Sequence, residues 1–220
     1  MSNSNMVTYT KLSPNCSKPR NHAIDTITIH HMAGNLSVQT CGELFAKPSR
    51  KASSNYGVNH KEVGLYVDEA NRSWCSSNGT NDNRAITIET ANDGGAPDWH
   101  IADDTMDTLI KLVADICRRN GIKKLIWSDD KSERVNHANG CNMTIHSDFA
   151  ATACPGPYLK SKMAYIASEV NKLIDADPGD DHIRYNVQIG SYKLKENAER
   201  QLEKAKTAGF TDAFIKEVKV

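Results

Sequence analysis

Two short segments with the same alternation of apolar and polar residues most constrain the fold of this chain. They are TITIH at residues 26–30 and AITIET at residues 85–90. A period of two is typical of β-strands. From 103 to 120 the apolar spacing changes to three and four residues, which predicts an amphipathic helix that Asp103 or Asp104 caps and Gly121 ends.

Further elements follow from the same patterns. Residues 55–59 and 64–68 are interpreted as two strands with a short connection, and residues 125–128 as a short buried strand. A second helix is expected after Pro157, because Met163, Ile166 and Val170 continue an apolar stripe at helical spacing.

The segment DADPGDDHIR, residues 175–184, separates two parts of the chain. It contains four Asp, one Pro and one Gly, a composition that buries little and breaks regular structure. We interpret it as a linker between a domain at 1–174 and a unit at 185–220. In the second part, residues 185–192 predict a strand, 195–208 a helix and 212–220 another strand, which together make a small βαβ unit.

The charge balance excludes several classes of function. Lys and Arg number 27, Asp and Glu also number 27, and the formal net charge is zero. The chain has no excess of basic residues, so its charge does not indicate nucleic acid or an anionic bilayer as a partner. The sequence contains no run of 18 apolar residues, so a membrane-spanning helix is not expected. The first 15 residues lack the basic and apolar regions of a secretory signal, so we expect a protein made in the cytoplasm.

Three residues are candidates for a zinc site: His30 at the end of a predicted strand, His146 in TIHSDF and Cys154 in TACPGP. Catalytic zinc typically takes three protein ligands and keeps a fourth position for water. Spacing alone does not establish such a site, because the chain has eight His and some will lie near strand ends without binding a metal. Both interpretations stay open on the residues alone.

Strand alternation places a carboxylate, that of Glu89, with the candidate zinc ligands. His30 lies on the strand face opposite Ile27 and Ile29, and Glu89 faces away from Ile86 and Ile88 in the same manner. A glutamate near a zinc-activated water can act as a general base. A solvated strand residue is the alternative interpretation of Glu89.

Several motifs resemble one known family when they are taken in order. They are ITIHHMAG, SSNYGV, NRSW, NDNRAITIE, ANDGGAP, TIHSDF and ATACPGPYL. Over about residues 7–174 the chain resembles the zinc-dependent N-acetylmuramoyl-L-alanine amidases of the amidase-2 type, which include phage lysins and are related to peptidoglycan-recognition proteins. The resemblance implies an α/β fold, with a mixed central β-sheet flanked by helices. It also implies that Zn²⁺ is held by His30, His146 and Cys154, with Glu89 as the catalytic glutamate.

Two further catalytic residues are implied by the same resemblance. Tyr56 in SSNYGV looks like the family's tyrosine near the metal, and Thr152 occupies the position two before the Cys ligand. Both would stabilise an oxyanion. The sequence departs from relatives at Cys75, which follows Trp74 where a His is common, and Glu89 stands in T-I-E where a Gly usually precedes the Ile.

Other histidines and cysteines receive different interpretations. His31 faces the opposite side of the strand and is not expected to bind the metal, whereas His100 and His137 are the alternative candidate ligands. Asp148 is expected to orient a zinc histidine or to cap the local backbone. Cys117 fits a small core residue, and all cysteines except Cys154 are expected to be reduced thiols.

The C-terminal unit resembles the first half of a SPOR domain, a module that binds peptidoglycan. We therefore expect residues 185–220 to bind the cell wall or to dimerise and complete a sheet; a tethered decoration without a ligand is the alternative. Bacterial peptidoglycan is the expected partner, without nucleic acid and without membrane insertion.

The reaction that the resemblance implies is hydrolysis of the amide between N-acetylmuramic acid and L-alanine. Two alternatives stay open: a recognition protein that binds peptidoglycan without cutting it, and a zinc peptidase that cuts within the stem peptide. We expect a phage or prophage endolysin that reaches the wall after holin-type release or lysis. An autolysin exported by another route and a cytoplasmic recycling amidase are the other origins.

Overall fold

The structure, a computed structural model, describes residues 2–176, 189–211 and 213–217. The chain divides into two compact units, Met1–Pro178 and Gly179–Val220, and the division falls inside the segment 175–184. Each unit is described here by itself.

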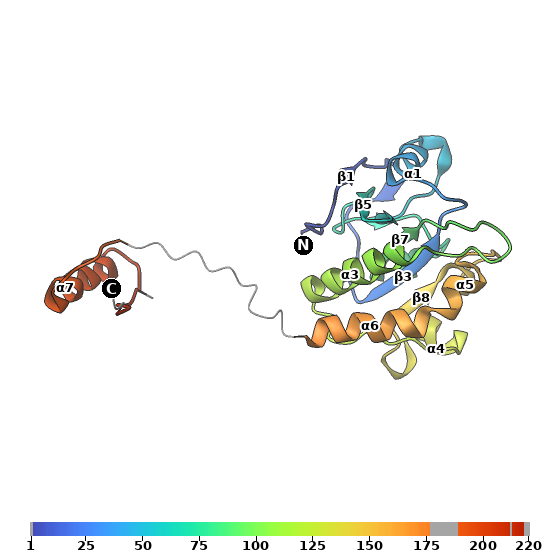
Figure 1. Ribbon diagram of the computed structural model, residues 1–220. Coiled ribbons are helices and arrows are strands. Elements are labelled where there is room, and N and C mark those ends of the chain that lie inside the picture. Colours follow the sequence, from blue (N-terminus) through green and yellow to red (C-terminus); the bar gives the residue numbers. More distant parts are fainter. Residues whose placement is uncertain (1, 177–188, 212, 218–220) are drawn as a thin grey trace. The chain divides into compact units, whose positions relative to one another are not determined.

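A six-stranded mixed sheet forms the centre of the first unit (Figure 1), in the order β1-β5-β4-β7-β3-β8. β3 lies between β7 and β8 and is parallel to both, whereas β4 is parallel to β7 and antiparallel to β5. β1 extends the sheet parallel to β5. The bounds are β1 Tyr9–Thr10, β3 Thr26–His31, β4 Tyr56–Asn59, β5 Glu62–Leu65, β7 Ala85–Thr90 and β8 Met143–Ile145. The predicted fold class, a mixed sheet flanked by helices, is confirmed.

Shorter elements connect these strands. β2 (Cys16–Ser17) and β6 (Arg72–Ser73) pair antiparallel as a separate two-stranded ribbon. The helices of this unit are α1 Val38–Phe45, α2 Gly79–Arg84, α3 Asp103–Asn120, α4 Lys131–Asn136, α5 Gly156–Ser161 and α6 Met163–Asp175, with the 3₁₀ turns η1 Pro48–Arg50, η2 Ala138–Gly140 and η3 His146–Asp148.

The main core lies between one face of the sheet and the helices α3 and α6. Ile27 and Ile29 of β3 and Ile86 and Ile88 of β7 are fully buried there, packed with the apolar stripes of the two helices. Burying a side chain of this size contributes about 1.5–3 kcal/mol. The apolar positions of the two alternating strands are therefore the ones that face this core.

The opposite face of the sheet carries a smaller apolar cluster and the polar residues of the strands. Met32, Cys41, Phe45, Tyr66 and Ala91 form that cluster, with Cys41 and Phe45 supplied by α1. The even-numbered residues of β3 point to this side, which brings the strand's polar side chains out of the main core.

The long helix begins and ends where the sequence predicts, from Asp103 to Asn120. Its N-cap differs from the prediction, because Ala102 occupies that position and makes no side-chain cap, while Asp103 and Asp104 lie in the first turn. There the two carboxylates still interact favourably with the helix dipole. Gly121 ends the helix with a φ of 73°, a left-handed conformation that favours glycine.

The strand predicted at residues 125–128 does not form. Side-chain amides take the place of a neighbouring strand. Asn171 exchanges hydrogen bonds with both backbone groups of Leu125, and the side-chain Oδ1 of Asn142 accepts from the Ile126 N–H. The helix expected after Pro157 is also divided, into α5 and α6 with a break at Lys162.

In the second unit, the predicted helix is present as α7, Lys195–Thr207. The described parts of the two predicted flanking strands, residues 189–192 and 213–217, form no strand, and the remainder of 185–192 and 212–220 lies outside the described residues. Several large apolar side chains of this unit are exposed, including Leu194, Phe210 and Phe214.

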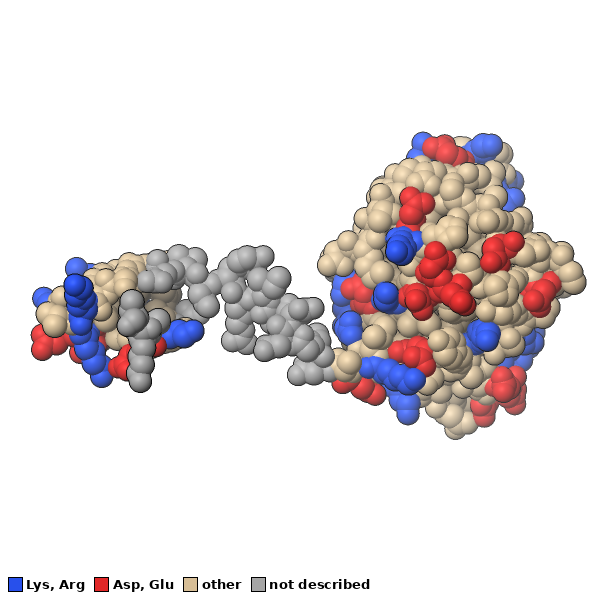
Figure 2. Space-filling view, in the orientation of Figure 1, with Lys and Arg blue, Asp and Glu red and all other residues tan. Residues whose placement is uncertain are grey.

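The surface of the first unit carries both signs of charge on the face shown in Figure 2, with Lys and Arg interspersed among Asp and Glu. This pattern agrees with the zero formal net charge. Within the described residues, no helix has the length and apolar character needed to cross a membrane.

Candidate metal centre

His30 lies near the carboxyl end of β3, the strand between β7 and β8. Its direct partner in the parallel register is Glu89 of β7. Both residues are on the strand face opposite the isoleucines, as the alternation predicts. His30 is only 1% exposed, and its Nε2 has no hydrogen-bond partner. A buried imidazole nitrogen without a partner is unusual in a folded protein, and a bound ion would explain it.

His146 and Cys154 meet His30 at this position. His146 begins η3 directly after β8, and its ring centroid lies 4.8 Å from that of His30. The Cys154 Sγ lies 3.6 Å from the His30 Nδ1. One donor atom from each of the three residues lies within 4.8 Å of the others. Zinc bonds of about 2.0–2.3 Å place tetrahedral ligands roughly 3.5 Å apart, so the three donors need only a small closure to hold one ion.

The protonation states at this cluster suit a cation. Burial lowers the pKa of His30, with His146 and His31 adding to the effect, and burial followed by His31 lowers the pKa of His146. Both imidazoles are therefore neutral at pH 7, as metal ligands must be. Burial and then Glu89 raise the pKa of the Cys154 thiol. A thiolate there requires a nearby positive charge, which a divalent ion supplies. The donor set fits zinc.

Glu89 supplies a carboxylate beside the cluster. Its Oε2 is shielded from solvent and has no hydrogen-bond partner. Burial raises the pKa of Glu89 to about 8, against a smaller opposing effect of Arg50. A general base works best when its pKa lies near the working pH, so this environment suits a group that accepts and returns a proton.

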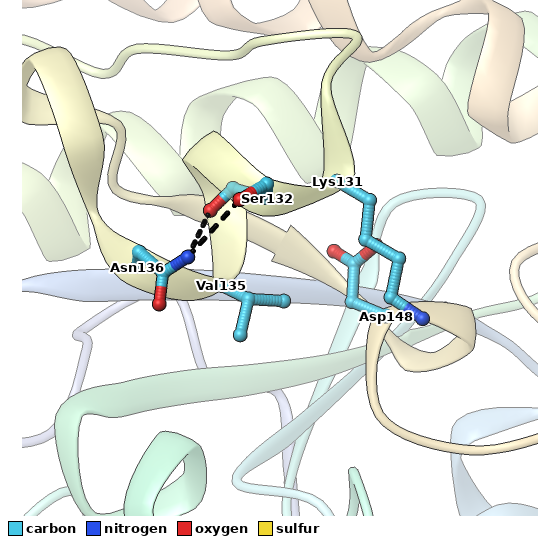
Figure 3. Close-up of a pocket in the computed structure, with 5 residues that line it drawn as sticks. All are labelled: Lys131, Ser132, Val135, Asn136 and Asp148. Atoms are coloured by element: carbon cyan, nitrogen blue, oxygen red, sulfur yellow. Dashed lines mark hydrogen bonds between the residues drawn. The ribbon is translucent and has the colours of Figure 1, made fainter.

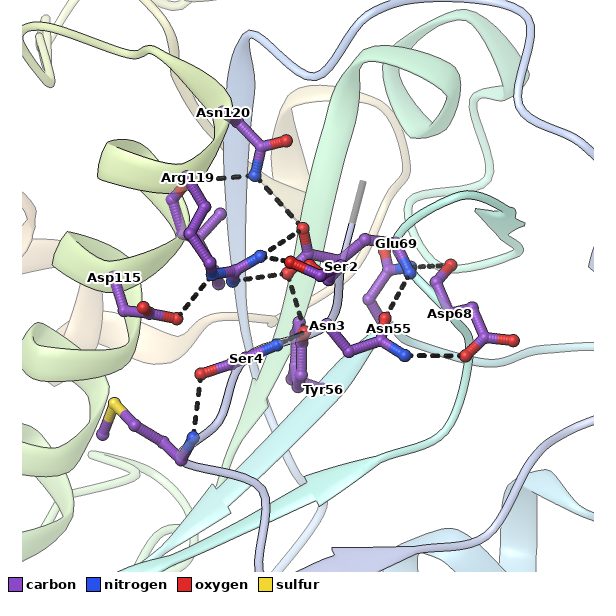
Figure 4. Close-up of polar contacts among 12 residues, drawn as sticks. Ser2, Asn3, Ser4, Asn55, Tyr56, Asp68, Glu69, Asp115, Arg119 and Asn120 are labelled. Atoms are coloured by element: carbon purple, nitrogen blue, oxygen red, sulfur yellow. Dashed lines mark hydrogen bonds and ion pairs between the residues drawn. The ribbon is translucent and has the colours of Figure 1, made fainter. Parts of the chain in front are cut away.

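Tyr56 does not lie at this cluster, and its predicted position beside the metal is wrong. Its register partner is Ile88, so its side chain lies on the core face of the sheet. The hydroxyl donates to the Glu69 Oε1 at 2.7 Å and accepts from the Ser4 N–H at 3.0 Å, within a polar network around Arg119 (Figure 4). Tyr56 therefore anchors the N-terminal segment.

Two further residues named in the sequence analysis, Thr152 and Asp148, each lie two positions from a candidate ligand. Thr152 is exposed, and its Oγ1 accepts from the Cys154 N–H at 3.2 Å, which leaves its own hydrogen free to donate. Asp148 accepts two hydrogen bonds from Arg134, at 2.9 and 2.6 Å, and one from the Ile145 N–H at 3.0 Å. It thus caps the local backbone beside His146, one of the two roles predicted for it.

The rings of three other histidines do not belong to the candidate ligand set, although the His31 backbone N–H donates to the Cys154 Sγ at 3.4 Å. His31 stacks on Trp99 with a centroid distance of 4.4 Å, and its Nδ1 lies 2.7 Å from the Met32 carbonyl oxygen. The His100 Nδ1 lies 2.6 Å from Asp93. The His137 Nδ1 lies 3.1 Å from the Cys141 carbonyl oxygen. None of these three joins the donor groups that the described residues form.

Sequence reasoning missed two residues around the cluster. Cys75 lies within 4.8 Å of donor atoms of His30 and Glu89, whereas the sequence only marked it as a departure from relatives. Trp99 has a φ of 58°, and a Cβ built on Gly156 would lie 2.9 Å from its side chain. No sequence signal identifies Trp99, because a left-handed conformation is rare for a bulky residue. All six cysteines are free thiols.

A shallow hollow of about 450 Å³ lies beside α4, lined by Lys131, Ser132, Val135, Asn136 and Asp148 (Figure 3). Its only link to the candidate centre is Asp148, whose carboxylate is already satisfied by Arg134. None of the candidate ligands lines it. The hollow is therefore separate from the candidate centre.

Comparison with known proteins places both units. Residues 20–157 match the N-acetylmuramoyl-L-alanine amidase family Amidase_2, and residues 181–220 match the SPOR domain. No curated protein matches the sequence.

Solved structures share the fold at low sequence identity. The catalytic domain of XlyA is 14% identical, with a TM-score of 0.56, over 74% of this chain and 99% of that one. The PlyG catalytic domain is 14% identical, with a TM-score of 0.56, over 77% and 96%. The Staphylococcus aureus hydrolase AmiA, solved with its ligand, is 15% identical, with a TM-score of 0.55, over 76% and 82%. With a family match over more than half of its length, the chain belongs to the amidase-2 family of N-acetylmuramoyl-L-alanine amidases.

Proposed function

We propose that this chain is a zinc-dependent N-acetylmuramoyl-L-alanine amidase that acts as a phage or prophage endolysin. The observation that carries the proposal is the convergence of His30, His146 and Cys154 beside the unpartnered carboxylate of Glu89. Family membership supports the amide between N-acetylmuramic acid and L-alanine as the bond that is cut.

The three ligands would hold the ion through two neutral imidazoles and one thiolate. When bound, zinc supplies a Lewis acid for the substrate carbonyl and lowers the pKa of water to about 7. Glu89 takes a proton from the attacking water and returns it to the leaving amine of L-alanine. Its raised pKa makes both transfers favourable near neutral pH.

The oxyanion donor in this proposal is Thr152. Its hydroxyl hydrogen is not used in the bond to the Cys154 N–H, so it remains available to the substrate oxygen. Removing such a donor typically costs about a hundredfold in rate. With Tyr56 engaged on the core face, Thr152 is the remaining member of the predicted donor pair.

The C-terminal unit is proposed to hold the enzyme on the wall. Its match to the SPOR domain indicates peptidoglycan as the partner. Because the net charge of the chain is zero, affinity for the wall must come from shaped sites. Wall binding is therefore the role proposed for this unit.

Mass spectrometry of digested peptidoglycan tests the reaction. An amidase releases intact stem peptides with a free L-alanine amino terminus. Fragments cut inside the stem would identify a peptidase, and binding without products would identify a recognition protein. Activity should be lost with a chelator and restored by zinc, and a Glu89→Gln variant should bind zinc but release no peptide.

A further inference from the structure

A second group of donor atoms adjoins the family's metal ligands. One donor atom each from His30, Cys75 and Glu89 lies within 4.8 Å of the other two. Imidazole nitrogen, thiolate sulfur and carboxylate oxygen are all zinc ligands. His30 belongs to both groups, whereas His146 and Cys154 belong only to the first.

Two atoms of this group are buried and unsatisfied. The His30 Nε2 and the Glu89 Oε2 have no hydrogen-bond partner, and His30 is only 1% exposed. An isolated buried carboxylate oxygen is costly unless it is paired, protonated or bound to a metal. A cation bound by an imidazole nitrogen of His30 and a carboxylate oxygen of Glu89 would reduce this cost.

Cys75 is held in place by its backbone. The Cys75 N–H donates to the Asp82 Oδ2 at 3.0 Å, and the same carboxylate accepts from the N–H and the hydroxyl of Ser76. His30 and Glu89 are direct partners in the parallel register of β3 and β7. The three donors are thus mounted on a strand pair and on a carboxylate-anchored turn.

We propose that His30, Cys75 and Glu89 form an alternative position for a thiophilic divalent cation. In this arrangement the shared His30 serves one ion at a time, in the family position or in the alternative one. Binding at the alternative position releases the thiol proton of Cys75 to solvent and makes Glu89 a ligand. An ion there is therefore coordinated by the carboxylate that the proposed function uses as a base. In that state the protein is inactive as an enzyme.

Cobalt binding to the full-length chain tests this proposal, because a thiolate bound to Co²⁺ gives a charge-transfer absorption. In Cys154→Ser, the family position lacks its only sulfur, so the alternative position predicts one Co²⁺ per chain that retains the thiolate band. The double variant Cys154→Ser/Cys75→Ser should lose the band and bind Co²⁺ at least about tenfold more weakly. Cys154→Ser/Cys117→Ala is the matched control, since Cys117 lies in the main core, and it should keep the band.

The contrary results are equally clear. A Cys154→Ser protein that is folded by circular dichroism but shows no thiolate band overturns the proposal, as does a band that survives in the double variant. The metal readouts stand apart from the proposed function. A wild-type chain that cuts no peptidoglycan would refute the function while leaving the cobalt result to decide the alternative position.

Discussion

The buried ion pair between Arg134 and Asp148 gives a sharp test of how the metal centre is held. The side chains are 3% and 1% exposed, and Asp148 also accepts from the Ile145 N–H. Arg134 lies on α4 and donates in addition to the Ser128 carbonyl oxygen at 2.7 Å. The pair therefore fixes η3, the turn that begins at His146, against α4.

Asp148→Asn removes the charge and leaves Arg134 buried without its counter-ion. Breaking a buried pair in this way costs about 3–5 kcal/mol. At roughly 2–4 °C per kcal/mol for a domain of this size, the melting temperature of the metal-free protein should fall by about 6–20 °C. Zinc affinity should fall as well, because the His146 turn loses its support.

Asp25→Asn is the matched control. Asp25 pairs with Arg84 at 2.5 Å, but the side chains are 38% and 29% exposed. Such a surface pair contributes about 0–1 kcal/mol, and the variant should bind zinc like the wild type. Thermal unfolding of chelator-treated protein and zinc titration against a competing dye measure both effects. Equal melting shifts in the two variants, or unchanged zinc affinity in Asp148→Asn, would refute the role given to this pair.

Three further predictions concern other parts of the first unit. Tyr56→Phe should lower the free energy of unfolding by about 1–3 kcal/mol, measured with a denaturant, because it removes a hydrogen bond to the buried Glu69. It should leave kcat unchanged, and a large loss of kcat would indicate that Tyr56 belongs to the active site. Gly156→Ala should destabilise the protein, because the φ of Gly156 is 83° and the added Cβ would lie 2.9 Å from the Trp99 side chain. Adding Trp99→Ala should recover part of the lost stability. Strict additivity of the two changes in a double-mutant cycle would argue against this contact. Glu89→Gln should raise the melting temperature of the chelator-treated protein, and the increase should be larger at about pH 8 than at about pH 5. In the folded state Glu89 has a pKa of about 8 and keeps a proton that the unfolded chain, with a pKa of 4.5, has lost, so the stability of the wild type falls as pH rises between those values. A difference in melting temperature that does not depend on pH would contradict this.

The parts of the fold that follow from local periodicity were predictable. Both alternating strands and the helix from Asp103 to Asn120 are present, and the shared polar face of His30 and Glu89 follows from alternation alone. Alternation is a property of neighbouring residues, so the sequence displays it directly.

The parts that depend on register and on distant side chains were not predictable. Tyr56 lies on the core face because it pairs with Ile88, and cross-strand register is not written in either strand. Residues 125–128 lack a strand because Asn171, 46 residues from Leu125, supplies the hydrogen bonds. Cys75 joins His30 only through the fold, so spacing in the sequence gave no indication of it.

The direct pairing of His30 with Glu89 also determines where this chain can tolerate changes in length. A strand advances about 3.3 Å per residue and alternates faces, so one residue inserted between Ala85 and Glu89 would displace the carboxylate and turn it toward α3. Insertions in the loop that follows β7, or deletions there, leave the pairing intact. Length variation among natural or engineered versions of this chain should therefore accumulate outside β3 and β7, because their register keeps His30 and Glu89 side by side.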